Sequence, residues 1–413
     1  MNQLLRTHAD QIALGAIRAV QPDAAVRRAL EHMPAQGDVV LAAAGKAAWK
    51  MAAVACDALG ERVKRGVVCT KRGHVMGELP RVDCYEGGHP IPDEGSFQGT
   101  EAAIRLVSNL TKDDTVLFLL SGGGSALFEK PLISPEELQD ITGQLLACGA
   151  DIVEINTLRK RFSQVKGGRF AQLCQPARVF SIVLSDIIGD PLDMIASGPA
   201  YPDASTAQDA LRVAEKYALR LSDQARELLN VETPKSLANV YTQVTGSVRE
   251  LCRAAMAECT RLGYEPMLLT DRMTCEARHA GDFMGAMLRT HADAKKNMAF
   301  VAGGETVVRL LGDGLGGRNQ ELALAAAKPL AGLKNAALFS LGSDGTDGPT
   351  DAAGGYVDGD TAGTLHERGI EMDEVLARND AYHALQACGG LIQTGPTGTN
   401  VNDVTVGLIR ATE

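Results

Sequence analysis

Short apolar runs alternate with polar, helix-like stretches along most of this chain. Five runs in the first half have the length of a strand: residues 38–43, 65–70, 82–85, 115–120 and 178–184. Runs of this kind, bounded by turn residues, are typical of buried strands. Because strand-like and helix-like segments alternate, the pattern predicts an α/β fold whose amino-terminal domain has a largely parallel sheet.

A second alternating block has strand-like runs at residues 265–270, 297–304, 306–310 and 335–341. Residues 201–245, between the two blocks, are polar and are predicted to be helical, and Pro234 marks a boundary there. The pattern therefore predicts two α/β domains, residues 1–235 and a smaller one at residues 236–413. Because ligands commonly bind where domains meet, we expect the active site in the cleft between them.

Composition narrows the class of protein. Lys plus Arg (41) against Asp plus Glu (51) give a net charge of −10, without the basic block that nucleic-acid-binding proteins carry. No apolar run could span a bilayer, and Met1–Thr7 favours a helix start over a signal peptide. Nine cysteines without a Cys-x-x-Cys pair indicate reduced, mostly buried thiols. We expect a cytoplasmic protein with small-molecule partners; a homodimer is left open.

A glycine-rich segment, Ser121-Gly122-Gly123-Gly124-Ser125, directly follows the run 115–120. Three glycines let the backbone turn tightly and approach a ligand without an intervening side chain. Consecutive N–H groups can then converge on an anion such as phosphate. The segment matches neither the Walker A loop, nor the dinucleotide fingerprint, nor the nucleophile elbow, so a tight structural turn is the alternative.

Two further segments place polar side chains where they can join this turn, because the carboxyl ends of parallel strands share one sheet edge. Lys46 follows the run 38–43 at a helix start. Since a lysine does not favour the positive end of a helix dipole, a bound anion would explain it; the alternative is a solvated lysine. His89 lies in a loop held by two glycines and two prolines, and we expect it to line the site.

Two acidic segments are candidates for catalysis or metal binding. Asp186 and Asp190 follow the run 178–184. Asp186 could act as a base or as a metal ligand, with Asp190 as its partner. The alternative is that the two aspartates form a turn that caps the next helix. Asp344, Asp347 and Asp351 do not fit the EF-hand pattern. Their carboxylates could bind a hard cation or substrate hydroxyls, or simply cap turns.

Two basic segments remain. The glycine-rich hairpin at residues 312–317 leads to Arg318 and Asn319 at a helix start. The planar fork of arginine suits carboxylate or phosphate better than the point charge of lysine. Residues 156–160 and 166–169 form a basic helix, for which we expect an exposed cationic face.

Together these segments resemble a known family. Six motifs carry the resemblance: Ser121-Gly-Gly-Gly-Ser-Ala-Leu, Ser185-Asp-Ile-Ile-Gly-Asp, Ala196-Ser-Gly-Pro, Gly317-Arg-Asn-Gln-Glu, Ser343-Asp-Gly-Thr-Asp-Gly-Pro-Thr-Asp-Ala-Ala-Gly and Thr397-Gly-Thr-Asn-Val-Asn-Asp. They are similar to motifs of the class II glycerate kinases (glycerate 2-kinases), whose carboxyl-terminal half is called the MOFRL domain. The match extends from about residue 46 to residue 403, nearly the whole chain.

The resemblance implies an enzyme that uses ATP and Mg²⁺ to phosphorylate the 2-hydroxyl of D-glycerate, giving 2-phosphoglycerate. It also implies a Rossmann-like amino-terminal domain and a smaller MOFRL-type α/β domain. Lys46 and Arg318 match residues that are taken to lie in the family's active site. Members have often been labelled hydroxypyruvate reductases, but this chain has no nicotinamide fingerprint to support that label.

The resemblance and the chemistry of phosphoryl transfer together give the expected roles. The turn made of Ser121, Gly122, Gly123, Gly124 and Ser125 binds the phosphates of ATP. The catalytic residues are Lys46, Asp186 and Arg318. Substrate contacts come from Lys46, Arg318, His89 and Asn319, and the metal ligands are Asp186, Asp190 and Asp344. Two rival functions stay open: an NAD(P)H-dependent hydroxypyruvate reductase and a non-catalytic sugar-acid or nucleotide sensor.

Overall fold

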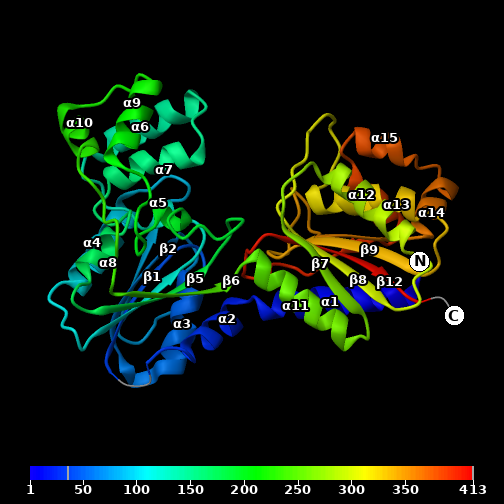
Figure 1. The fold of residues 1–413 in the computed structure, drawn as a ribbon, viewed down its shortest axis with the longest axis horizontal. Coiled ribbons are helices and arrows are strands. Elements are labelled where there is room, and N and C mark those ends of the chain that lie inside the picture. The colour runs from blue at the N-terminus through cyan, green and yellow to red at the C-terminus, as the bar shows by residue number, and fades with distance from the viewer. Residues whose placement is uncertain (35–36, 412–413) are drawn as a thin grey trace. The chain divides into compact units, whose positions relative to one another are not determined.

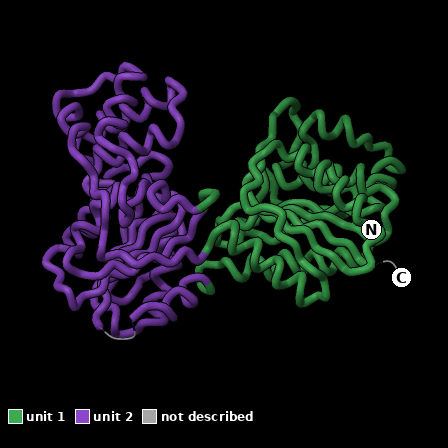
Figure 2. The backbone as a smooth tube through the Cα atoms, viewed as in Figure 1, with its two compact units in different colours: residues 1–24, 186–189, 246–413 green, residues 25–185, 190–245 purple. Residues whose placement is uncertain are grey.

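The computed structural model describes residues 1–34 and 37–411. They form two compact units (Figure 2). The amino-terminal unit comprises Ala25–Ser185 and Asp190–Thr245, and the carboxyl-terminal unit comprises Met1–Ala24, Asp186–Gly189 and Gly246–Glu413. The first helix therefore belongs to the carboxyl-terminal unit. The predicted domains, residues 1–235 and 236–413, placed it in the amino-terminal one.

The amino-terminal unit is built on a six-stranded sheet in the order β3-β2-β1-β4-β5-β6 (Figure 1). The pairs from β3 through β5 are parallel, as predicted. The strands are β1 (Val39–Ala44), β2 (Val63–Lys71), β3 (Val82–Gly87), β4 (Thr115–Leu120), β5 (Arg178–Leu184) and β6 (Val240–Gly246).

The chain order reverses between β1 and β4, which are neighbours in this sheet. Their register pairs Ala44 with Leu120, so the two carboxyl ends lie side by side. In open α/β sheets such a switch point is where ligands bind. The strand order therefore brings the turns after β1 and β4 to the favoured position for a site.

The helices of this unit connect the strands and add a small helical cluster. They are α2 (Pro22–Leu30), α3 (Ala48–Leu59), α4 (Glu94–Val107), α5 (Gly124–Leu127), α6 (Pro135–Ala147), α7 (Ile152–Arg161), α8 (Arg169–Leu173), α9 (Ala207–Lys216) and α10 (Asp223–Leu229). Helices α2 and α3 pack with β1 and its neighbours in one apolar core. Helices α6, α7, α9 and α10 form a second core of their own.

The carboxyl-terminal unit has a mixed sheet in the order β11-β10-β9-β12-β8-β7. Only the β7–β8 pair is parallel among the described strands of this sheet. The strands are β7 (Glu265–Met273), β8 (Met298–Gly304), β9 (Ala336–Gly342), β10 (Gly354–Asp358), β11 (Leu391–Ile392) and β12 (Asp403–Ile409).

Helices cover both faces of this second sheet (Figure 1). On one face α1 (Gln3–Ala19) and α11 (Val248–Arg261) share a core with alternate residues of β8, β9 and β12. On the other lie α12 (Ala277–Thr290), α13 (Arg318–Leu330), α14 (Thr361–Glu367), α15 (Met372–Ala377) and α16 (Ala381–Cys388). The predicted two-domain α/β architecture is confirmed.

Two local predictions are wrong. Residues 306–310 do not form a strand; only Val307 makes an isolated bridge, to Glu276. Residues 240–246 form β6, although the segment 201–245 was predicted to be helical. Strand β6 lies at the sheet edge and is only half-buried, so its sequence carries polar residues that mask the usual strand pattern.

The cysteines agree only in part with the prediction of mostly buried thiols. All nine cysteines lie within the described residues and are free thiols; Cys69, Cys174, Cys252 and Cys259 are buried, whereas Cys148 and Cys275 are exposed. Within residues 1–34 and 37–411, none of the helices is both long enough and apolar enough to cross a bilayer.

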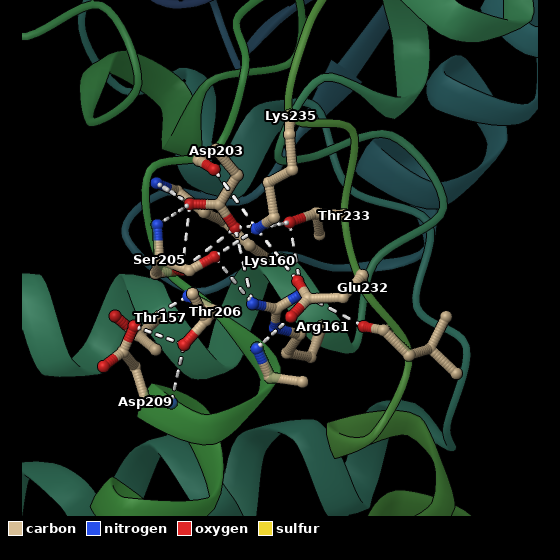
Figure 3. Close-up of polar contacts among 12 residues, drawn as sticks. Thr157, Lys160, Arg161, Asp203, Ser205, Thr206, Asp209, Glu232, Thr233 and Lys235 are labelled. Atoms are coloured by element: carbon tan, nitrogen blue, oxygen red, sulfur yellow. Dashed lines mark hydrogen bonds and ion pairs between the residues drawn. The ribbon is translucent and has the colours of Figure 1, made fainter.

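Helix α7 carries a network of buried charges (Figure 3). Lys160 and Arg161 are 2% and 0% exposed, so the exposed cationic face expected for residues 156–160 is wrong at Lys160. Lys160 Nζ lies 3.1 Å from Asp203 Oδ1, and Arg161 Nη1 donates to Thr233 Oγ1 at 3.1 Å. Arg161 Nη2 also donates to the Ser205 carbonyl at 2.9 Å. The network ties two irregular segments, around residues 203–205 and 231–235, to α7.

Asp203 makes this network sensitive to acid. Burial opposes the charged form of Asp203, but the Lys160 ammonium and the Thr233 hydroxyl outweigh it, so the pKa of this carboxyl lies below its ordinary value of 3.8. The native state therefore binds this proton less tightly than the unfolded chain does. The stabilisation is complete above the ordinary pKa and is lost as the pH falls through the lower, folded value.

Replacing Thr233 by valine should destabilise the protein. The hydroxyl donates to Asp203 Oδ2 at 2.7 Å and is 3% exposed, so water cannot replace it. We expect urea unfolding to show a loss of about 1–3 kcal/mol. Thr290→Val is the matched control, because that exposed hydroxyl bonds only the Ala286 carbonyl of its own helix. Equal losses in the two variants would contradict a stabilising role for the network.

Candidate active site

Two turns meet at the carboxyl ends of β1 and β4. Ser121 N donates to the Ala44 carbonyl at 3.0 Å, and Lys46 N donates to the Gly122 carbonyl at 2.9 Å. Gly45 has a φ of 119°, and a Cβ at this position would overlap Ser121. The close approach of the two turns thus depends on Gly45. Lys46 and the glycine-rich turn, expected at one sheet edge, are brought together.

Gly123 lies beneath two of the predicted site residues. Its φ is 84°, and a Cβ there would lie 3.1 Å from both Lys46 Cγ and His89 Cδ2. The loop after β3 therefore brings His89 to the same place as Lys46. Any side chain at position 123 would both strain the backbone and press on these two groups.

The glycine-rich turn has spare hydrogen-bond donors. Among the described residues, no acceptor receives the backbone N–H groups of Gly122, Gly123, Gly124 or Ser125. Successive N–H groups around a left-handed glycine form a concave donor set that suits an anion. The geometry therefore favours anion binding over a merely structural turn.

The charges around the turn are positive. Burial lowers the pKa of His89 below its ordinary value of 6.5, and the nearby ammonium groups of Lys46 and Lys71 lower it further. The imidazole is thus neutral at pH 7, and it is the two lysines that offer positive charge to a ligand. His89 therefore adjoins the turn as a neutral group, while its contact with substrate stays a prediction.

A buried lysine that the sequence did not single out fixes the far end of the turn. Lys166 is fully buried and donates from Nζ to the carbonyls of Ser125 and Phe128, each at 2.9 Å. Its charge is paired with Glu129 Oε2 at 3.1 Å. Lys166 was visible in the sequence only as part of the basic stretch expected at the surface, so nothing there indicated its positioning role.

The carboxyl-terminal unit has a separate cavity of 910 Å³. Its polar lining includes Glu305, Arg318, Glu321, Asp344, Asp347 and Asn379. Arg318 begins α13, as the sequence predicted, and two of the predicted residues, Arg318 and Asp344, line this one cavity.

Arg318 is held by two carboxylates. Its Nε and Nη2 donate to the two oxygens of Asp403 at 2.6 and 3.0 Å, and its Nη1 donates to Glu305 at 3.2 Å. Burial raises the pKa of Asp403 to about 6, while Arg318 acts in the opposite direction. A two-pronged pair of this kind fixes the plane of the guanidinium. Its side chain keeps 34% of its surface exposed, available to a ligand.

Asn319 is used inside the protein. It is 1% exposed; its side-chain nitrogen donates to Asp347 at 3.3 Å, and its side-chain oxygen accepts the Ser340 hydroxyl at 2.6 Å. Asp347 also accepts the N–H groups of Asn319 and Gln320, which begin α13. Burial raises the pKa of the Asp347 carboxyl. Asn319 therefore supports the first turn of α13, while its substrate contact stays a prediction.

The three predicted metal ligands are not gathered by either unit. Asp186 and Asp344 belong to the carboxyl-terminal unit and Asp190 to the amino-terminal unit. Asp344 accepts the Thr346 N–H at 3.0 Å, which is a turn contact. Asp190 Oδ1 is buried and has no hydrogen-bond partner within the described residues. No group of three or more His, Cys, Asp or Glu side chains in the described chain could hold a metal ion.

Comparison with protein families and known proteins gives consistent matches. Residues 8–230 match DUF4147, a domain of unknown function, and residues 298–403 match the MOFRL family. A D-glycerate 2-kinase of Thermotoga maritima is 49% identical over 411 residues, which is 98% of each chain. The crystal structure of a glycerate kinase from that organism superposes with a TM-score of 0.95 over 98% of this chain and 100% of its own.

Two further relatives bear on the choice of reaction. A glycerate 2-kinase of Pyrococcus horikoshii is 39% identical over 95% of each chain. A protein of Agrobacterium vitis that carries a provisional hydroxypyruvate reductase name is 35% identical over 95% of this chain and 92% of its own. The more similar relatives thus favour the kinase over the reductase.

Proposed function

The chain belongs to the glycerate kinase family, and on this premise we propose that it transfers the γ-phosphoryl group of ATP to the 2-hydroxyl of D-glycerate. The products are ADP and 2-phosphoglycerate. The observation that carries the proposal is the set of N–H groups at Gly122–Ser125, next to Lys46, that have no acceptor among the described residues. Such a turn at a sheet switch point supports binding of a polyphosphate.

The reaction forms one bond and breaks one. The 2-oxygen of glycerate bonds to the γ-phosphorus, and the bond from that phosphorus to the β–γ bridging oxygen breaks, so that ADP leaves. The hydroxyl proton passes to a base, for which we assign Asp186. Phosphoryl transfer depends on positioning and on neutralising charge, and Lys46 and Arg318 are the cations proposed for this task.

Magnesium supplies further positive charge to the β- and γ-phosphates when it is bound. We retain Asp186, Asp190 and Asp344 as its proposed ligands, although the described residues do not gather three such side chains around one point. The donor chemistry fits, because Mg²⁺ prefers carboxylate oxygens and keeps several waters. Asp190 offers a buried oxygen without a hydrogen-bond partner in the described chain, which an ion could satisfy. Arg318 would then hold the carboxylate of glycerate or the γ-phosphate.

One experiment separates the proposed reaction from its rivals. Purified protein is mixed with ATP, Mg²⁺ and D-glycerate, and phosphorus NMR identifies the product. We expect 2-phosphoglycerate and ADP; 3-phosphoglycerate would refute the assigned hydroxyl. A parallel sample with hydroxypyruvate and NADH tests the reductase named among the relatives. Loss of nicotinamide absorbance there, with no ADP formed from glycerate, would overturn the proposal.

Replacing Gly123 by alanine should weaken ATP binding. A left-handed backbone costs about 1–2 kcal/mol for a residue with a Cβ, and the new methyl presses on Lys46 and His89. We expect the KM for ATP to rise about tenfold with little change in the KM for glycerate. Gly363→Ala is the control, since a Cβ there meets nothing within 4 Å. A KM for ATP equal to that of the control would contradict phosphate binding at the turn.

A further inference from the structure

We propose that the nucleoside half of the phosphoryl donor binds in a second pocket of the amino-terminal unit, beside the glycine-rich turn, with Arg159 as its hydrogen-bond donor. The inference rests on the proposed function, because it assumes that the turn holds the phosphates of the same molecule. The inference gives a role to a pocket that the phosphoryl-transfer step itself does not use.

The pocket has a volume of 280 Å³ and mainly apolar walls. One wall is helix α6, which contributes Leu138, Thr142, Gly143 and Leu146; the other is formed by Pro90–Pro92 and Phe97. Ile91 and Leu146 are 56% and 63% exposed, so apolar surface of the pocket remains open to a ligand. Apolar walls with a few placed polar groups are typical of small-molecule sites. A flat heterocyclic base suits these walls, whereas glycerate is small and polar throughout.

Arg159 supplies the polar group that such a ligand needs. It extends from α7 into the lining of the pocket and is mostly removed from water, which lowers its pKa. Among the described residues its guanidinium forms no hydrogen bond and no close ion pair, and Glu129 acts on it only electrostatically at longer range. Glu129 also lines the pocket; its Oε2 is paired with Lys166 Nζ at 3.1 Å, and its Oε1 is buried without a hydrogen-bond partner in the described chain.

Arg159 can therefore donate to a ligand. A guanidinium carries five N–H donors, and Arg159 lines the pocket without a hydrogen bond from them to the described residues. A purine base offers ring nitrogens as acceptors and a flat face on which the guanidinium can stack. A purine base in the pocket would therefore give Arg159 both a hydrogen-bond acceptor and a stacking partner.

The pocket and the turn are continuous. Ser125 is the last residue of the turn and also lines the pocket, and Pro90 and Ile91 directly follow His89. A ligand with its phosphates on the N–H groups of Gly122–Ser125 therefore has the pocket adjoining one end of its phosphate chain. Lys46 and His89 lie over Gly123, toward the other end. The order of groups is that of a nucleoside triphosphate.

Gly143 allows the pocket to be filled without disturbing the core. It lies on the exposed side of α6, and a Cβ there meets nothing within 4 Å. Gly143→Leu places a side chain in the pocket, and Gly143→Ala is the matched control. Calorimetry on the full-length protein measures the Kd of ATP and of inorganic tripolyphosphate, which has phosphates but no nucleoside. Relative to the control, we expect Gly143→Leu to raise the Kd of ATP about tenfold and that of tripolyphosphate less than about twofold.

Arg159→Gln tests the donor separately and should weaken ATP more than tripolyphosphate. Equal ATP affinity in Gly143→Leu and Gly143→Ala would overturn the inference. If Gly143→Leu raised the Kd of ATP and that of tripolyphosphate equally, the pocket would bind phosphate and the inference would be overturned. A raised KM for glycerate, with the affinity for ATP unchanged, would overturn it as well. Turnover of glycerate by the parent protein separates the proposed kinase function from the proposed nucleoside pocket. If the parent is active and Gly143→Leu does not change the Kd of ATP, only the nucleoside pocket is refuted. If the parent neither binds ATP nor turns over glycerate, both proposals are refuted.

Discussion

Replacing Lys46 by alanine should lower kcat/KM for the ATP-dependent phosphorylation of D-glycerate by about 10³-fold, the cost of losing a cationic group in comparable phosphoryl transfer. Lys46 is exposed and lies over Gly123. Its described hydrogen bonds use the main chain and survive the substitution: its N–H donates to the Gly122 carbonyl, and its own carbonyl contacts Thr70 and His74. The fold should therefore be kept while the charge beside the phosphates is lost. Steady-state kinetics with varied ATP and varied glycerate measure the effect.

The matched control is Lys64→Ala. Lys64 lies near the amino end of β2, at the opposite edge of the same sheet, and its surface pair with Asp38 at 3.5 Å contributes little. We expect activity near that of the parent. Lys46→Arg should recover part of the lost rate, because it restores charge but not the compact ammonium. Lys46→Ala with near-parental turnover and intact folding would refute the role of Lys46 in catalysis.

Replacing Arg318 by alanine should reduce kcat/KM by about 10²- to 10³-fold, the cost of losing one positioned donor to developing charge. The variant also leaves the Asp403 carboxylate buried without its two-pronged partner. Its pKa, already raised by burial to about 6, should rise further, because the guanidinium now lowers it. Arg318→Ala should therefore bind a proton at Asp403 near neutral pH.

Two variants separate catalysis from structure at this position. Arg318→Lys keeps a positive charge near Asp403 but cannot bond both carboxylate oxygens and a ligand together, so stability should recover more than kcat does. Arg253→Ala is the surface control, since that residue forms only an exposed pair with Glu250. If Arg318→Lys restores kcat and thermal stability in parallel, Arg318 is a structural residue and the catalytic assignment fails.

Much of the fold follows from local sequence. Buried parallel strands need unbroken apolar runs, and this is why β1, β4 and β5 were predicted almost to the residue. Strand β6 was missed because an edge strand is half-buried and tolerates the polar side chains of Thr242 and Gln243. The run at residues 306–310 is apolar and β-branched, yet it finds only one bridge partner, so composition alone predicted a strand where pairing does not occur.

The sequence by itself determined that a lysine, a histidine and a glycine-rich turn each follow a strand, because those residue types and their spacing are local properties. Only the tertiary structure decided which charges are exposed. The sequence predicted a cationic surface that includes Lys160 and Lys166, but carboxylates and carbonyls distant in the chain surround and bury these two residues and Arg161. Arg159, from the same basic stretch, instead lines a pocket without a hydrogen-bond partner in the described chain. Partners distant in sequence set the environment of each charge, and no local pattern contains them.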